Sequence, residues 1–219
     1  AGQFIWTGVD YIGEPTPWHN QNDTPVKSSY FGIVDTAGIP KNDYYLYQSQ
    51  WLALDQQPMV HILPHWNWEI HKSYQQVVDK YGDIPVRVYS NARSVELFLN
   101  GKSQGRKTFQ EKWTSDGRKY QEGEGSDQLY LEWRLAYQPG ELHAVAYDRQ
   151  GQIVAEDRVV TAGKPAKIGL HAEKTKLEPD GQDLLYLYFD VLDKDGNWVP
   201  SASNQLHFEI EGPARIVGV

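Results

Sequence analysis

The amino-acid sequence predicts a mainly β protein, in which a strand, a loop and a helix precede one β-sandwich and the start of another. Short apolar runs separated by turn dipeptides fill residues 84–160 at the spacing of a β-sandwich. Upstream, an apolar run and a helical stripe of large side chains predict one strand and one helix. Downstream, a linker at 162–165 precedes a new alternating pattern. The predicted domains are residues 1–55, 56–162 and 163–219.

The first segment opens with the apolar run Gln3–Val9, which is typical of a strand buried on both faces. A proline-containing loop then leads to a second short apolar run, Tyr30–Val34. Pro40 suits the first turn of a helix, because its missing N–H group costs nothing there. We expect that helix from Lys41 to about Leu54, with a stripe of large side chains that indicates core packing. The stripe consists of Tyr44, Tyr47, Trp51 and Leu54.

The two following segments have the signals of β-strands and tight turns. Asn100-Gly101 separates two apolar runs and predicts a hairpin turn. The polar stretch 110–127 predicts a long exposed hairpin loop. Further along, Leu184–Leu192 and Leu206–Ile210 predict strands of the last module. Four strands cannot close a sandwich, so we expect this module to be partial.

Composition excludes several classes of function. The net charge of −8 argues against nucleic acid, which is bound through lysine and arginine. The sequence has no run of about 18 apolar residues, so we expect no membrane span. The absence of cysteine removes disulfides, thiolate catalysis and cysteine zinc sites. Such a chain suits a secreted or wall-attached bacterial protein, and equally a cytosolic one, so localisation stays open.

The stretch Gly2–Trp18, GQFIWTGVDYIGEPTPW, is the strongest candidate site. An apolar strand breaks here into a loop rich in glycine, proline, carboxylates and aromatic rings. Aromatic faces stack on the apolar side of a pyranose, and carboxylates bind its hydroxyl groups. Read alone, Asp10 and Glu14 are either a catalytic carboxylate pair or supports that accept backbone N–H bonds. The nearby polar residues match no metal motif, so we expect a loop there and no metal or cofactor. Those residues are His19, Asn20, Asn22 and Asp23.

Three other groups invite a functional interpretation, and each has a structural alternative. Trp66 and Trp68 would form either a sugar-stacking platform or packing at a domain junction, which we favour. Aromatic residues around 110–127 suggest a glycan-gripping hairpin, although a decorated loop is the simpler interpretation; they are Trp113, Tyr120 and Tyr130. The acidic turn from Asp193 to Asn197 resembles part of a calcium loop, but it lacks the later glutamate, so a β-turn is favoured.

With these residues in view, the chain resembles the β-galactosidases of glycoside hydrolase family 2, in particular the multidomain streptococcal type. FIWTGVDYIGEPTPW and SSYFGIVDTAGIPKNDYYLYQSQW resemble the last strand, loop and helix of that family's catalytic (β/α)8 barrel. PMVHILPHWNW and IPVRVYSNARSVELFLNGKSQG resemble the β-sandwich after the barrel. TAGKPAKI leads into an Ig-like module containing DGQDLLYLYFDVLDKDGNWVP. The resemblance therefore implies a barrel end, an Ig-like sandwich and the start of a second one.

The resemblance also implies a function. Such enzymes hydrolyse terminal β-linked galactose with retention, using two glutamates about 5–5.5 Å apart. The family places these glutamates on the fourth and seventh barrel strands, so neither is expected here, and no catalytic residue is assigned. This chain would be a C-terminal fragment, inactive alone, that packs against the rest of the barrel. Trp6 would form the floor of the galactose subsite, often before a cis peptide, Asp10 would order the loop, and Trp18 would line the mouth.

The alternative is a different class of protein. The β-sandwiches would then form a non-catalytic module that binds glycans or acts as a spacer. Binding that depends on the sandwich alone would favour this alternative over the enzyme.

Overall fold

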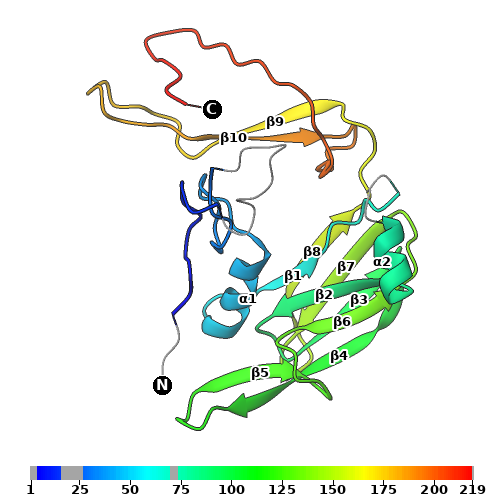
Figure 1. Cartoon of the computed structure of the whole chain (residues 1–219). Helices are drawn as coiled ribbons and strands as arrows, with labels where there is room; N and C mark the ends of the chain where they lie inside the picture. The colour runs from blue at the N-terminus through cyan, green and yellow to red at the C-terminus, as the bar shows by residue number, and fades with distance from the viewer. Residues whose placement is uncertain (1–3, 16–26, 70–73, 219) are drawn as a thin grey trace. The chain divides into compact units, whose positions relative to one another are not determined.

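A computed structural model describes residues 4–15, 27–69 and 74–218, and divides the chain into two compact units, Ala1–Thr161 and Ala162–Val219 (Figure 1). The chain is mainly β, as expected, with two short α-helices among the described residues. None of the described helices is long and apolar enough to span a bilayer.

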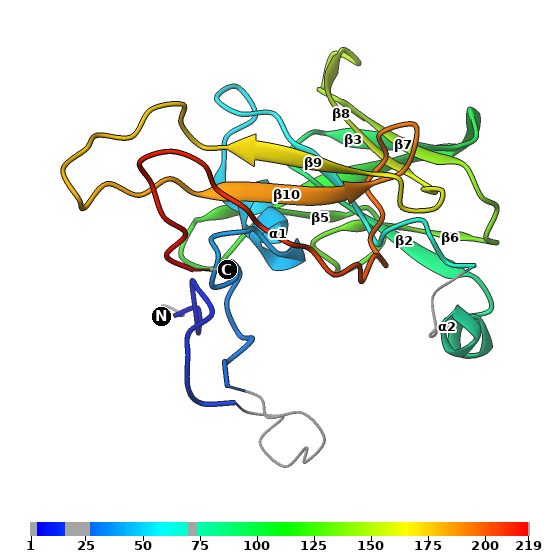
Figure 2. The ribbon, with the colours of Figure 1, turned by 90° about the horizontal axis from the view of Figure 1, so that it is seen from above.

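Two antiparallel sheets enclose the core of the first unit (Figures 1 and 2). One has the order β1-β2-β6, and its strands are Val60–Leu63, Ile84–Ser90 and Leu131–Leu135. The other has the order β5-β4-β3-β7-β8. Its strands, in that order, are Lys119–Gly123, Lys102–Trp113, Ser94–Leu99, Glu141–Tyr147 and Ile153–Val160. The helix α2, Tyr74–Tyr81, precedes β2.

The alternation read from the sequence produces this core. Val86 and Val88 of β2 are fully buried, and they pack with Leu97 of β3 in one apolar cluster. Trp66 and Trp68 belong to the same cluster, so the sugar-platform interpretation of these two residues is wrong. The indole N–H of Trp66 donates to the Gln138 carbonyl at 2.8 Å, which satisfies its buried polar atom.

The stretch 110–127 is more ordered than a loop. Residues 109–113 of β4 pair with 119–123 of β5 in a regular antiparallel ladder. Oppositely charged side chains contact each other diagonally across it, since Lys119 contacts Glu111 and Lys112 contacts Glu122. Cross-strand charge pairs of this kind stabilise a polar hairpin that lacks an apolar face, which is why the loop prediction failed.

The N-terminal segment differs most from its prediction. Residues 4–9 form no ladder strand, and Val9 makes one parallel bridge to Val34. Phe4 is 97% exposed and Trp6 is 69% exposed, so the expected burial on both faces is absent. The reason is that the described chain offers this segment a pairing partner on one side only.

The helix α1 spans Asn42–Trp51, with Lys41 as its N-cap, and is shorter than predicted. Tyr44 and Tyr47 are half-buried and Leu54 packs on the core, whereas Trp51 is exposed. The core-packing interpretation is therefore wrong for Trp51, which is the last residue of the helix and has its ring centre 4.9 Å from that of Tyr47.

The second unit contains the antiparallel pair β9, Lys167–Ala172, and β10, Leu187–Leu192. The predicted strand 206–210 is in no ladder. The turn after β10 is organised by the buried Asp193 carboxylate, which accepts N–H bonds from Gly163, Asp195 and Asn197. These bonds hold the pKa of Asp193 far below its usual range, with that from Gly163 the largest cause. The β-turn interpretation of this acidic stretch is confirmed.

His61 gives a test of this packing through pH. Its ring stacks on Tyr45 at 3.7 Å, and burial lowers the pKa of the imidazole, opposed by Asp157. As the pH is lowered, His61 takes up a proton near pH 6.5 in the unfolded chain and only at a lower pH in the folded chain. The free energy of unfolding therefore falls as the pH drops below about 6.5. We predict a shallower fall in the free energy of unfolding between pH 7 and 5 for His61→Gln.

The control is His207→Gln, since that side chain is 84% exposed. Urea unfolding at several pH values measures both slopes. Equal slopes for His61→Gln and the parent chain would contradict a buried neutral imidazole.

Candidate functional site

The Trp6 loop, residues 6–14, lies beside 27–34 and is held to it by the backbone. Thr7 accepts an N–H bond from Ile33 at 3.2 Å, and Gly8 accepts one from Val34 at 3.1 Å. Asp10 N–H returns a bond to the Val34 carbonyl at 2.9 Å. These bonds follow a parallel pairing, in agreement with the Val9–Val34 bridge.

Gly32 makes this pairing possible. A Cβ atom on Gly32 would lie 2.2 Å from the backbone nitrogen of Asp10 and 2.5 Å from the carbonyl carbon of Val9. Both are backbone atoms, so they cannot swing aside as a side chain would. Only glycine therefore permits the two segments to approach this closely.

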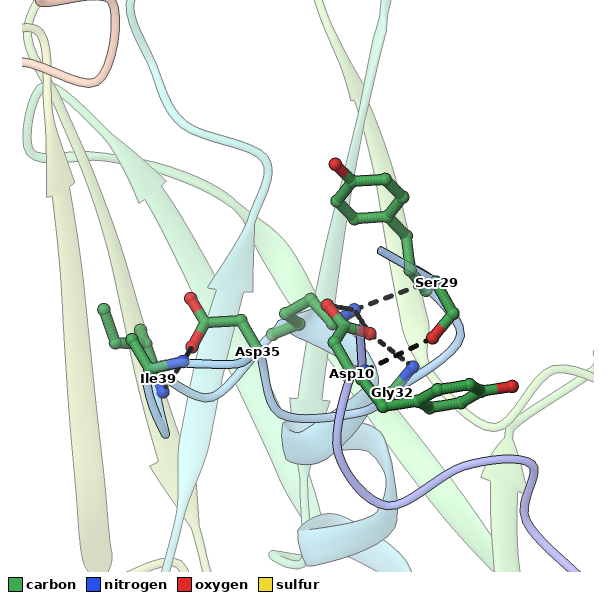
Figure 3. A network of polar contacts seen from close by, with 9 residues as sticks. Asp10, Ser29, Gly32, Asp35 and Ile39 are labelled. Carbon is green, nitrogen blue, oxygen red and sulfur yellow. Dashed lines mark hydrogen bonds and ion pairs between the residues drawn. The ribbon is translucent and has the colours of Figure 1, made fainter. Parts of the chain in front are cut away.

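The Asp10 carboxylate fixes the loop from within (Figure 3). Its Oδ1 accepts the Gly32 N–H at 2.7 Å, and the Lys41 ammonium donates to both carboxylate oxygens at 2.8 and 2.9 Å. The same ammonium donates to the Tyr30 carbonyl at 3.2 Å. The Asp10 side chain is 4% exposed, so its charge is compensated in a nearly dry setting. Because Lys41 is the N-cap of α1, this ion pair joins the loop to the helix.

Two further contacts shape the loop (Figure 3). Ser29 N–H donates to the Tyr11 carbonyl at 2.9 Å, and the Ser29 hydroxyl accepts the Tyr11 N–H at 3.3 Å. On the way to the helix, one oxygen of Asp35 accepts the N–H groups of Ala37 and Ile39, each at 2.8 Å. This Asx turn reverses the chain ahead of α1.

Trp6 stands out of this frame with its indole exposed. The Trp6–Thr7 peptide is cis, as the family resemblance implies. The Tyr11 ring meets the indole edge-on, with centroids 6.4 Å apart and planes at 88°. The Tyr11 hydroxyl donates to Glu14, and that bond raises the pKa of the Tyr11 hydroxyl. An exposed indole with a fixed aromatic neighbour is a surface on which a sugar ring stacks.

The remaining sequence candidates lie elsewhere. Asp10 and Glu14 have separate partners, Lys41 and Tyr11, which favours their interpretation as supports over a catalytic pair. Trp18 and the polar residues 19–23 lie outside the described residues. No cluster that could hold a metal ion occurs among the residues that the structure describes. Of the hairpin aromatics, Trp113 is 61% exposed, and Tyr120 and Tyr130 are half-buried.

Gly32 and Lys41 position the loop, and neither is predicted to do so by the sequence. The sequence marks Lys41 only as the start of a helix, and Gly32 only as part of an apolar run. A glycine inside a strand pattern is a known sign of close backbone approach, so Gly32 carries a usable signal. Lys41 carries none, because its partner is 31 residues away.

The close backbone approach at Gly32 leads to a prediction about amide hydrogen exchange. We expect Gly32→Ala to break the pairing of 7–10 with 31–34, so the amides of Asp10 and Val34 should exchange with deuterium faster. Gly8→Ala is the matched control, because a methyl group on Gly8 would have no other atom within 4 Å. Unchanged protection in Gly32→Ala would contradict this close approach.

Comparison with known proteins finds relatives of this chain among glycoside hydrolases. Residues 168–219 match the model of glycoside hydrolase family 2 C-terminal domain 5, and residues 82–155 match a domain of unknown function, DUF4982. The chain is 42% identical over its full length to the β-galactosidase BoGH2A of Bacteroides ovatus. It is 33% identical, again over its full length, to a putative β-glucuronidase of Formosa agariphila. These matches cover 22% and 19% of the two relatives, so the chain spans about a fifth of their length.

Solved structures agree with the sequence matches. A β-glycosidase from Bacteroides vulgatus aligns with a TM-score of 0.67 and 34% identity, over 90% of this chain and 21% of that one. A glycosyl hydrolase family 2 member from Bacteroides cellulosilyticus aligns with a TM-score of 0.65 and 28% identity, over 90% of this chain and 26% of that one. These relatives come from Bacteroides and Formosa, so the resemblance to the streptococcal type stays a prediction.

Proposed function

We propose that this chain is the C-terminal region of a retaining exo-β-galactosidase. The premise is that the chain carries a C-terminal domain of glycoside hydrolase family 2. The observation that carries this proposal is the 42% identity over all 219 residues to a β-galactosidase. The parent enzyme removes terminal β-linked galactose, and this region supplies one wall of the galactose site together with non-catalytic β-sandwiches.

In this proposal Trp6 is the residue that contacts galactose. Its indole is exposed and is held beside Tyr11, on a loop fixed by hydrogen bonds to 31–34. The C–H face of galactose stacks on such a ring, which orients the anomeric carbon toward the reacting groups. Asp10 supports the loop from behind through Gly32 and Lys41, and we assign Trp18 to the mouth of the pocket.

The exposed apolar face of the loop fits the same proposal. Phe4 and Val9 are exposed on a segment that has the sequence pattern of a buried strand, and Ile12 is exposed in the loop that follows it. Leaving such side chains in water costs about 1.5–3 kcal/mol each relative to full burial. We propose that they pack against the remaining strands and helices of a (β/α)8 barrel.

Cleavage itself requires groups that we assign to other residues of the parent enzyme. A retaining glycosidase needs one carboxylic acid to protonate the leaving oxygen and one carboxylate to attack the anomeric carbon. In this chain, Asp10 is engaged by Lys41 and Glu14 by Tyr11, which leaves neither well placed for these roles. The residues of this chain therefore bind and orient the sugar and exclude water.

Trp6 gives the sharpest test of this role. In the parent enzyme we expect Trp6→Ala to lower kcat/KM for a chromogenic β-galactoside by about 10- to 100-fold, the equivalent of about 1.5–3 kcal/mol of lost apolar contact. Trp6→Phe should retain much of the activity, because a ring remains for stacking.

Trp113→Ala is the matched control, since that indole is exposed to a similar degree, 61% against 69%, and lies on the β4–β5 hairpin. We expect it to leave kcat/KM unchanged. Equal losses in the two alanine variants would show that Trp6 has no special contact with substrate.

The assignment of the glutamates to other residues makes a second prediction. The purified 219-residue chain should hydrolyse the same β-galactoside no faster than a buffer blank. Its folding is checked in parallel by circular dichroism, which should report β structure. Turnover comparable to that of a complete family 2 enzyme would refute this assignment.

Two other functions compete with this one. The match to a putative β-glucuronidase favours a uronic-acid substrate, so a β-glucuronide should be assayed beside the β-galactoside. The exposed Trp113 favours the alternative of a glycan-binding or spacer module. Three results together separate the proposal from both alternatives. The parent enzyme acts on the β-galactoside and not on the β-glucuronide, Trp6→Ala lowers this activity, and Trp113→Ala leaves it unchanged.

A further inference from the structure

A second candidate site lies on the first unit, at an open edge of its two sheets. β6 is the edge strand of the three-stranded sheet and pairs only with β2. Residues 102–108 of β4 pair with β3 and precede the part that pairs with β5, so one side of them has no strand partner among the described residues. A groove of about 610 Å³ lies here, lined by residues of both sheets and by the loop 124–130.

Side chains from each strand bridge this edge. The Trp133 indole N–H of β6 donates to the Gly105 carbonyl of β4 at 3.2 Å. The Lys107 ammonium of β4 donates to the Glu132 carbonyl of β6 at 2.5 Å and lies 5.3 Å from the centre of the Trp133 ring. These bonds hold the two walls of the groove in a fixed relation, which makes it a formed site rather than a gap between mobile strands.

The groove concentrates positive charge on an acidic protein. Four of its lining residues are cations, Arg87, Arg106, Lys107 and Arg134, and two are carboxylates, Glu124 and Glu132. The formal charge of the lining is therefore 4 − 2 = +2, whereas the whole chain carries −8. A local excess of positive charge attracts an anionic ligand and does not repel a neutral one.

The contacts show which of these charges face the groove. The Glu132 carboxylate is shared, with Arg87 Nε at 3.0 Å and Arg134 Nη2 at 3.1 Å, so one negative charge meets two positive ones. Lys107 has no carboxylate within ion-pair distance among the described residues. Arg106 already has two partners, since its Nε donates to the Ser94 hydroxyl at 2.8 Å and its guanidinium lies 3.8 Å from the centre of the Tyr147 ring, so we leave it out of the proposed contacts.

The remaining lining residues suit a carbohydrate. Thr108, Ser126 and Gln128 supply hydroxyl and amide groups that exchange hydrogen bonds with sugar hydroxyls. Tyr130 adds an aromatic ring, with the Arg87 guanidinium 4.8 Å from its centre. Half of the twelve lining residues are exposed, so the groove is open along the edge and suits an extended chain rather than an enclosed small molecule.

We propose that this groove binds an acidic polysaccharide, through carboxylate or sulfate groups that contact Lys107, Arg134 and Arg87. It is separate from the Trp6 loop, and its function does not depend on the assignment of the parent enzyme. Its role is to hold a charged glycan on the β-sandwich.

The test uses the 219-residue chain and three polymers of different chemistry. Polygalacturonate offers carboxylates, dextran sulfate offers sulfates, and dextran offers only hydroxyls. In affinity electrophoresis we expect retardation by one or both of the charged polymers and none by dextran. The polymer that retards the chain identifies which anionic group is recognised.

Paired charge variants then locate the binding. Lys107→Gln with Arg134→Gln should weaken binding at least tenfold. Lys164→Gln with Lys176→Gln removes the same charge from exposed positions outside the groove and should bind like the parent chain. If the first pair fails to fold, Lys107→Gln alone provides the test, because its ammonium has no carboxylate partner among the described residues.

Three results would overturn the proposal. The first is the absence of retardation by either charged polymer at low salt. The second is an equal loss in the two double variants, which would indicate unspecific attraction by net charge. The third is equal affinity for single-stranded DNA, which would show that the groove recognises charge without recognising a carbohydrate.

Discussion

The ion pair between the buried Asp10 carboxylate and the half-buried Lys41 ammonium is the interaction on which the candidate sugar site depends. Asp10 binds the Gly32 N–H and the Lys41 ammonium at the same time, so one carboxylate ties together the loop, its neighbouring segment and the first turn of α1. Removing the Lys41 ammonium would leave the buried Asp10 carboxylate without its counter-charge, which is destabilising. Trp6 is positioned because the backbone behind it cannot move independently of the helix.

The helix is in turn joined to the β-sandwich. The Gln50 side chain of α1 and the backbone of Gln121 on β5 exchange two hydrogen bonds, at 3.4 and 3.2 Å. Asn91, which follows β2, donates to the carbonyls of Leu52 and Gln57 beyond the helix. The sandwich therefore supports the loop through α1, although it contributes no side chain to the Trp6 surface among the described residues.

Local patterns predicted the sandwich well and the N-terminal segment poorly. Alternation along β2, β3 and β7 defines one buried face, and a strand needs only that face to be located from sequence. The Gln3–Val9 run has the pattern of a buried strand, but burial is a property of neighbours, and the described chain supplies a neighbour on one side only. The prediction of a loop at 110–127 failed for a different reason. The stability of the hairpin at 109–123 comes from charges paired across strands rather than from regularly spaced apolar residues.

The site shows the same division. Trp6 and Asp10 are candidates from sequence because their residue types cluster in one loop, and the family resemblance implies a role for Trp6 that stays a prediction. The sequence does not identify the positioning roles of Lys41 and Gly32, nor the basic groove. Each depends on residues brought together from distant positions, such as Lys107 with Glu132. The most direct measurement of the central claim is a crystal structure of the parent enzyme with galactose bound. We predict the C–H face of the sugar in van der Waals contact with the Trp6 indole, and Asp10 still paired with Lys41 behind it. A galactose bound away from Trp6, or an indole covered by other barrel residues, would contradict this claim.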